Sequence, residues 1–288
     1  MKSPYTSKRW RGFFLEKNQT MKLPPFERIL HKEDFAENTV ETYSYAVQDF
    51  LTRYKKPSSE SLSAYKAFLV NTYKPTTVNV RILSLNKYME ALGHDELKMK
   101  TIKIPKESFL DHIISNEDYL SFKELLRKEP DLRWHFIVWF LAATGARISE
   151  LVRFTVQDVH AGYVDIYSKG GRMRRLYFPE RLQKKALKQL EKEGRSSGFL
   201  FLNARGERLT PRGISLRLKE FAVKYGIDPG QVHPHAFRHL FAKNFLQKNN
   251  DIALLADLLG HSSIETTRIY LQQSSREQGK MVDEIVDW

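Results

Sequence analysis

The chain of 288 residues contains no cysteine. Disulfide bonds, thiolate nucleophiles and cysteine-ligated zinc are therefore excluded, and the absence fits a reducing cytoplasm, the compartment expected here. No apolar run approaches the ~18 residues that a membrane-spanning helix needs. The basic N-terminal stretch leads only into "FFL", residues 13–15, which is too short for the apolar core of a signal peptide. We therefore expect no membrane partner.

Acidic residues are in the minority, because 34 Asp and Glu face 47 Lys and Arg, and the net charge is +13. Such an excess favours a polyanionic partner, since each Lys or Arg set against a phosphate releases condensed counterions. Hydrophobic residues make up 41% and charged residues 28%, which is typical of a folded globular chain and not of a disordered one. DNA or RNA is the partner class that this balance favours over a merely basic surface.

The first part of the chain predicts a small helical unit, residues 25–95, after an N-terminal arm, residues 1–24. Three segments of this unit have the apolar periodicity of amphipathic helices: residues 39–54, 61–73 and 75–92. Lysines and arginines are distributed over the polar faces of these helices. Such faces belong either to a solvated bundle or to a bundle that grips a phosphate backbone.

Residues 96–114 have no clean periodicity and carry several lysines around Pro105. This composition predicts a linker, and an extended basic linker is also able to track a DNA groove. A second unit, residues 115–288, follows. It begins with Ser115 and Asp118, whose spacing is that of a helix N-cap.

The second unit is predicted to be mainly α with a small antiparallel β-sheet. Residues 162–168 alternate between apolar and polar, reach the turn "KGG" and are followed by the alternating residues 172–179. This pattern predicts a β-hairpin. The remaining segments have helical periodicity, with glycines such as Gly145 and Gly260 as stop signals.

The stretch "VHPHAFRHLFAKNFL", residues 232–246, holds three of the nine histidines of the chain. His235 and Arg238 are three residues apart, and His235 and His239 are four apart, so each pair shares a face of a helix beginning near Pro234. The histidine spacing permits a metal, but no acidic residue belongs to the cluster and the arginine would repel a cation. An anionic phosphoryl group, with a proton to be moved, is the better interpretation.

Three further stretches carry candidate site residues. Arg147 follows a glycine break at the start of a helix, where backbone N–H groups and a planar guanidinium favour phosphate oxygens. Lys169 stands on the turn of the predicted hairpin. His261 stands at a helix junction, and Tyr270 follows it by nine residues on the next predicted helix. Each residue taken alone has an ordinary structural interpretation, as a helix-end arginine, a solvated lysine or a packed tyrosine.

In chain order the four stretches read "TGARISEL", "SKGGRMRR", "HAFRH" and "LGHSSIETTRIY". The set resembles the tyrosine recombinase family, which includes phage-type integrases and the Xer-like resolving recombinases. The resemblance covers residues 115–288 at the level of motifs, and residues 25–95 are similar only in general shape to the N-terminal domain of that family. It implies a helical, SAM-like core-DNA-binding domain followed by an α+β tyrosine recombinase catalytic domain.

The resemblance implies a role for each candidate at the scissile phosphate. Tyr270 would attack the phosphorus, form a 3′-phosphotyrosyl link and free a 5′-hydroxyl. Arg147 and Arg238 would clamp the non-bridging oxygens, and Lys169 would protonate the leaving 5′-oxygen. Since the free phenol has a pKa of about 10, neighbouring cations are expected to favour the phenolate.

Two further catalytic residues and two supporting residues complete the implied site. His235 would assist proton transfer around the nucleophile, and His261 would hydrogen-bond the phosphate. Glu150 and His239 would orient the residues around them. No metal or other cofactor is implied, because the covalent link conserves the energy of the phosphodiester bond.

The implied function is that of a site-specific DNA recombinase, for integration, excision or resolution of DNA. Its expected partners are double-stranded DNA, further copies of the chain as a homotetramer on two recombination sites, and accessory DNA-bending proteins. The free chain is expected to be a monomer or a dimer. Two alternatives stay open: DNA relaxation of the type IB topoisomerase kind, and a non-catalytic DNA-binding protein on the same fold. The last residues, including Val282, Ile285 and Trp288, are expected to dock either on their own chain or on a neighbouring protomer.

Overall fold

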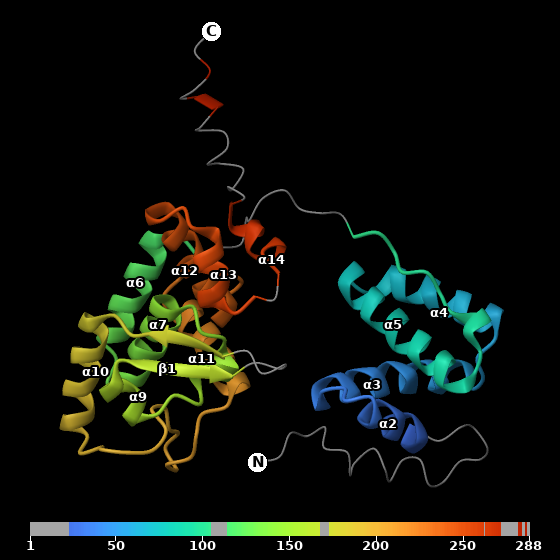
Figure 1. Cartoon of the computed structure of the whole chain (residues 1–288), viewed down its shortest axis with the longest axis horizontal. Helices are drawn as coiled ribbons and strands as arrows, with labels where there is room; N and C mark the ends of the chain where they lie inside the picture. Colours follow the sequence, from blue (N-terminus) through green and yellow to red (C-terminus); the bar gives the residue numbers. More distant parts are fainter. Residues whose placement is uncertain are drawn as a thin grey trace. The chain divides into compact units, whose positions relative to one another are not determined.

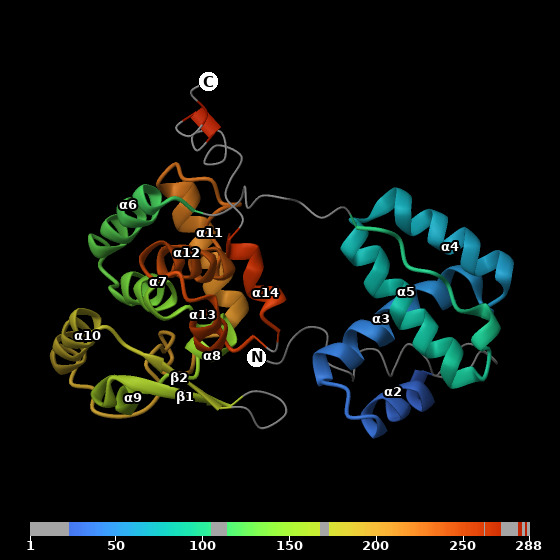
Figure 2. The same ribbon diagram turned by 45° about the horizontal axis from the view of Figure 1, so that its top comes forward.

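The structure is a computed structural model that describes residues 23–104, 114–167, 173–261, 263–271, 282–283 and 286. The chain divides into two compact units, Met1–Lys106 and Glu107–Trp288 (Figures 1 and 2). Across the described residues, helices predominate and two antiparallel strands form the one regular sheet. The prediction of a mainly α fold with a small antiparallel sheet is thus confirmed. No helix in these ranges is long and apolar enough to cross a membrane.

The first unit is a helical bundle. Its described elements are α2 (Leu23–Lys32), α3 (Glu37–Tyr54), α4 (Ser59–Thr72), α5 (Pro75–Leu92) and the 3-10 turn η1 (Asp95–Leu97). The apolar faces of the helices enclose one core in which Val47, Phe50 and Ile82 are completely buried. The sequence predicted α5 to the residue, because Pro75 suits a first helical turn and Gly93 ends the helix in the left-handed conformation.

The beginning of the predicted linker packs on this first unit. The side chain of Asn86 on α5 donates to the carbonyl of Met99 and accepts from its N–H, both at 2.8 Å. Asn79 makes the same pair of bonds with Ile102, at 2.9 and 2.8 Å. Seven helical residues span ~10.5 Å and three extended residues span ~10 Å, so the two spacings match. Residues 98–104 therefore run along α5 without regular secondary structure of their own.

The second unit surrounds a larger core. Its helices are α6 (Asn116–Arg127), α7 (Arg133–Thr144), α8 (Ile148–Leu151), α9 (Val156–Ala161), α10 (Glu180–Lys192), α11 (Pro211–Lys224), α12 (Pro234–Lys248), α13 (Ile252–Leu259), α14 (Glu265–Arg268) and the 3-10 turn η2 (Ile269–Leu271). Ser115 caps α6 as predicted, since its hydroxyl accepts from the N–H of Asp118 at 2.9 Å. Helices α7 and α13 end at Gly145 and Gly260, both with φ of 64°, as the glycine signals predicted.

The predicted hairpin consists of β1 (Tyr163–Tyr167) and β2 (Met173–Tyr177), paired antiparallel with Tyr163 opposite Tyr177 and Tyr167 opposite Met173. Because side chains alternate along a strand, Arg174 and Leu176 face the core while Arg175 faces outward. Residues 168–172, which connect the two strands and include Lys169, lie outside the described residues. The expected docking of the C-terminal residues also lies largely outside them.

The hydrogen bonds of Asn79 and Asn86 to the backbone of Ile102 and Met99, called the asparagine clasp below, lead to a first prediction. Replacing both Asn79 and Asn86 by alanine removes four hydrogen bonds, each worth ~1 kcal/mol. We expect trypsin to cleave after Lys98, Lys100 and Lys103 at least about tenfold faster than in the unchanged chain. Asn71→Ala, at an exposed asparagine on α4, is the matched control and should cleave at the original rate. Equal rates for all three proteins would show that the clasp does not hold the segment.

Candidate active site

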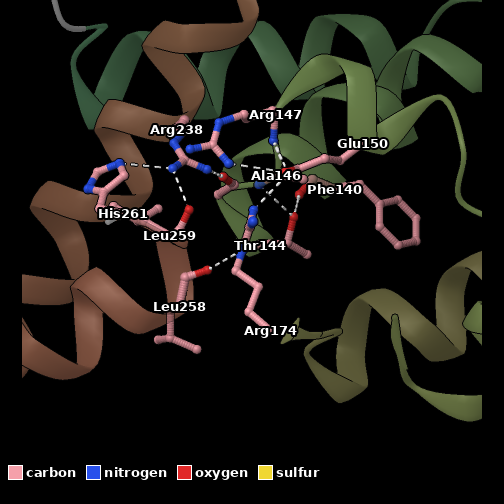
Figure 3. A network of polar contacts seen from close by, with 11 residues as sticks. Phe140, Thr144, Ala146, Arg147, Glu150, Arg174, Arg238, Leu258, Leu259 and His261 are labelled. Carbon is pink, nitrogen blue, oxygen red and sulfur yellow. Dashed lines mark hydrogen bonds and ion pairs between the residues drawn. The ribbon is translucent and has the colours of Figure 1, made fainter. Parts of the chain in front are cut away.

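The guanidinium of Arg238 lies at the centre of the site and is buried, with 3% of the residue exposed. It extends from α12, where Nη1 donates to the carbonyl of Gly145 and Nη2 donates to the carbonyl of Leu259, both at 2.7 Å (Figure 3). These carbonyls stand at the C-terminal ends of α7 and α13, where the helix dipole concentrates partial negative charge. Burial, and then the charge of Arg147, lower the pKa of Arg238 to about 10, so the group stays charged at neutral pH.

Arg147 stands just before α8 and is held by Glu150. The backbone N–H of Arg147 donates to Glu150 Oε2 at 2.7 Å, and its Nη1 lies 3.2 Å from Glu150 Oε1. The side chain is 36% exposed, so the guanidinium remains open to a ligand. The carboxylate of Glu150 thus holds both the backbone and the guanidinium of Arg147 at the start of the four-residue helix α8. The orienting role predicted for Glu150 has this contact as its basis.

Glu150 also binds an arginine that the sequence analysis did not select. Arg174 Nη2 donates to Glu150 Oε2 at 2.8 Å, and Arg174 Nε donates to the carbonyl of Leu258 at 3.0 Å. Three guanidinium groups, those of Arg147, Arg174 and Arg238, thus gather around one carboxylate (Figure 3). The excess of positive charge suits an anionic ligand such as a phosphodiester.

His261 follows the end of α13, and both of its ring nitrogens have partners. Nε2 lies 3.0 Å from Arg238 Nη2, and Nδ1 lies 2.8 Å from the hydroxyl of Thr267. Because a guanidinium can only donate, Nε2 must be the accepting nitrogen, and Nδ1 carries the proton. In this arrangement His261 positions Arg238, and it can donate to a phosphate only after Nε2 changes its partner and gains a proton. Thr267 was not selected from the sequence, although it lies within the "LGHSSIETTRIY" motif.

Tyr270 is buried, with 7% of the residue exposed, and lies on the 3-10 turn η2 and not within a regular α-helix. Its ring centroid is 5.3 Å from that of His239 and 6.3 Å from that of His261, the latter nearly parallel at 14°. Burial raises the pKa of the Tyr270 phenol, and the charges of Arg238 and Arg147 and a hydrogen bond from Arg238 oppose this rise without cancelling it. Nearby cations thus favour the phenolate as expected, but burial outweighs them in the ligand-free site and the pKa of the phenol stays raised.

The histidines of the opening stretch have different surroundings. His233 is the N-cap of α12, since its Nδ1 accepts from the N–H of Ala236 at 3.1 Å. His239 packs against Tyr270, and its buried Nδ1 has no hydrogen-bond partner among the described residues. His235 is exposed, and its ring centroid lies 5.7 Å from that of His239, the residue that packs against Tyr270. Partial burial and the charges on Arg238 and Arg147 lower the pKa of His235.

The structure therefore gathers most of the predicted residues at one place. Those it brings together are Arg147, Glu150, His235, Arg238, His239, His261 and Tyr270. Lys169, the remaining candidate, lies outside the described residues. In the described ranges no group of three or more histidine and acidic side chains is arranged to hold a metal ion.

Comparison with known proteins defines the class of this fold and site. The family model described as the phage integrase family matches residues 114–277. The chain belongs to this family, which is that of the tyrosine recombinases. Tyrosine recombinase XerA of Pyrococcus furiosus is 29% identical over 270 residues, covering 91% of this chain and 92% of the relative. Tyrosine recombinase XerD of Yersinia pestis is 28% identical over 263 residues, covering 83% and 88%.

Solved structures have the same fold. A crystal structure of XerA recombinase is 25% identical with a TM-score of 0.54, covering 91% of this chain and 96% of the other. A lambda integrase dimer bound to a core site is 17% identical with a TM-score of 0.69, covering 88% and 95%. XerH recombinase bound to its difH substrate is 19% identical with a TM-score of 0.66, covering 96% and 92%. The last two likenesses concern the fold alone.

Two partly buried histidines, His239 and His261, predict how stability depends on pH. Burial, followed by nearby charges, lowers the pKa of both His239 and His261 to about 4. The unfolded chain binds these protons near pH 6.5, so each neutral histidine stabilises the fold above that pH. This contribution is lost as the pH falls from 6.5 to 4, by up to about 1.4 kcal/mol per pH unit for each histidine.

The measurement is the free energy of unfolding by denaturant at several pH values between 4 and 7. We expect the stability of His239→Gln to depend less steeply on pH than that of the unchanged chain, because one of the histidines with a lowered pKa is gone. Identical slopes for the two proteins would contradict the assignment of a neutral, buried His239.

Proposed function

We propose that the chain is a site-specific DNA recombinase that cuts and rejoins strands through a 3′-phosphotyrosyl intermediate. The observation that carries this proposal is the convergence of Arg147, Arg238 and His261 beside Tyr270, within one unit of one chain. The family membership and the relatives named tyrosine recombinases support it. The type IB topoisomerase alternative and the non-catalytic alternative are not favoured by these relatives.

The proposed substrate is double-stranded DNA. The net charge of +13 suits it, and the lambda integrase and XerH structures of similar fold were solved with DNA sites. The helical first unit, residues 25–95, is the proposed core-DNA-binding domain, and residues 115–288 form the proposed catalytic domain. Strand exchange between two sites requires four active copies, so a homotetramer on DNA is part of the proposal. A monomer or dimer when free, and accessory DNA-bending proteins, complete it.

Arg147 and Arg238 would hold the scissile phosphate. The exposed guanidinium of Arg147 can bind one non-bridging oxygen directly. Arg238 uses three of its five N–H donors on Gly145, Leu259 and His261, which leaves two donors for Tyr270 and the phosphate. Donors fixed in this way stabilise the charge that develops on the phosphoryl oxygens, and each is worth ~10²–10³ in rate.

The proposed reaction makes one P–O bond for each bond that it breaks. The oxygen of Tyr270 attacks the phosphorus while the bond to the 5′-oxygen breaks, and Lys169 would give the leaving oxygen its proton. Since the resting phenol is neutral, its proton must leave during the attack. His235 is the proposed acceptor, because it is the exposed histidine of the site. Attack on the phosphotyrosine by the 5′-hydroxyl of another strand then restores the phenol.

The nucleophile is tested with a duplex selected for binding from a random-sequence library and then nicked near the point of cleavage. Tyr270→Phe should bind this duplex as tightly as the unchanged chain and form no covalent protein–DNA adduct. Tyr167→Phe, at a 76% exposed tyrosine on the hairpin, is the matched control and should form the adduct normally. An adduct that persists in Tyr270→Phe would remove this residue as the nucleophile.

Strand exchange is distinguished from relaxation by a supercoiled plasmid that carries two copies of the selected site. We expect DNA circles or inversions joined at the two sites, detected by restriction mapping. Relaxed plasmid without any exchange of flanking DNA would instead indicate the topoisomerase reaction. A plasmid that is bound but unchanged would indicate a DNA-binding protein without catalysis.

A further inference from the structure

Two neighbouring arginines on β2 have opposite surroundings. Arg175 faces outward, where it binds Asp165 at 2.7 and 2.8 Å and covers the ring of Tyr163. Arg174 faces inward and is only 8% exposed. Burying a guanidinium costs desolvation free energy, and this cost suggests that Arg174 has a specific role that depends on its charge and shape.

Arg174 joins two parts of the active site that are far apart in the sequence. Its Nη2 donates to Glu150 Oε2, the same oxygen that accepts the backbone N–H of Arg147. Its Nε donates to the carbonyl of Leu258, next to the carbonyl of Leu259 that holds Arg238. The hairpin is thereby connected both to the carboxylate that orders Arg147 and to the helix end that precedes His261 (Figure 3).

The backbone at Gly260 packs directly against the side chain of Arg174. A Cβ atom added at Gly260 would lie 2.6 Å from Arg174 Nη1 and 2.7 Å from its Cδ, closer than real contacts allow. The left-handed φ of 64° at Gly260 also favours glycine. His261 is the next residue, so the position of its ring depends on how Arg174 packs. Arg174 Nη1 has no hydrogen-bond partner among the described residues, so full hydrogen bonding does not account for the placement of the group.

We propose that Arg174 is a positioning residue of the recombinase site: by bridging Glu150 and the end of α13, it sets Arg147 and His261 in place around the scissile phosphate. This role rests on the proposed function. Arg174 does not itself touch the DNA, because its guanidinium is buried behind Glu150 and Gly260 and two of its nitrogens are committed to protein oxygens. Its charge also acts on the site, since it contributes to the lowered pKa of both Arg238 and His261.

The test separates binding from chemistry. Arg174→Lys keeps the charge but replaces two separate donor nitrogens in a plane by one nitrogen, so it cannot hold Glu150 and Leu258 in the same geometry. We expect its affinity for the selected duplex to stay within about twofold, because no DNA contact is removed. The single-turnover rate of adduct formation on the nicked duplex should fall about 100-fold, as small misplacements of catalytic groups typically cause. Arg175→Lys is the matched control on the same strand and should keep the original rate.

A double-mutant cycle tests whether Arg174 acts through Glu150. Glu150→Gln alone should slow adduct formation, because Arg147 is no longer held by a carboxylate. Adding Arg174→Lys to this variant should cost less than about threefold more, since the contact that it disrupts is already weakened. A cost in the double variant equal to the product of the two single costs would show that Arg174 acts independently, and would overturn the proposal.

The remaining outcomes are also decisive. If the unchanged chain forms no adduct, the proposed function fails and Arg174 is not at issue. If the unchanged chain forms the adduct and Arg174→Lys forms it equally fast, the positioning role is refuted. Should Arg174→Lys not fold, Arg174→Gln, which carries no buried charge, replaces it in the same assays. If neither variant folds while Arg175→Lys does, Arg174 serves folding only and the proposal is overturned.

Discussion

The packing of the helices in the second unit depends on one buried cation, Arg238, which binds the C-terminal ends of two helices. Arg238 is a residue of α12, yet it donates to the carbonyl of Gly145, which caps the end of α7, and to the carbonyl of Leu259, the last residue of α13. These bonds fix the relative positions of three helices, and Gly145 and Gly260 allow the chain to turn immediately afterwards. Arg147 and His261 each follow one of these turns within two residues. The contact that supports the fold therefore also brings the candidate catalytic groups together.

The ligand-free site keeps Arg238 charged and keeps Tyr270, His239 and His261 neutral at neutral pH. Burial raises the pKa of Tyr270, while burial and nearby cations lower the pKa of His239 and His261 to about 4. The phenol is thus not ionised before a phosphate arrives. A bound phosphodiester offsets the positive charge of the arginines and places an electrophile beside the tyrosine. Because a bound anion also cancels charges that favour the phenolate, the phenol would lose its proton to a base during the attack and not before it.

The sequence predicted the elements of the fold where one local signal dominates. Pro75 and Gly93 bound α5, and alternation with the "KGG" turn predicted the hairpin. Motif order selected the residues of the site, because four short stretches in one order are specific. The direction of the hydrogen bonds at His261 and the pKa of Tyr270 could not be predicted from the sequence, since both depend on side chains from other helices. The inward position of Arg174 had a signal, because it alternates with Arg175 and shares a face with Leu176.

In the proposed site, two guanidinium groups and one phenol meet at a single phosphate. The most direct measurement is a crystal structure of the Tyr270→Phe variant bound to its selected DNA duplex. The account predicts one backbone phosphate within about 3 Å of donors from both Arg147 and Arg238, with the ring of residue 270 beside it. Arginines that contact different phosphates, or a phosphate held far from that ring, would contradict the account.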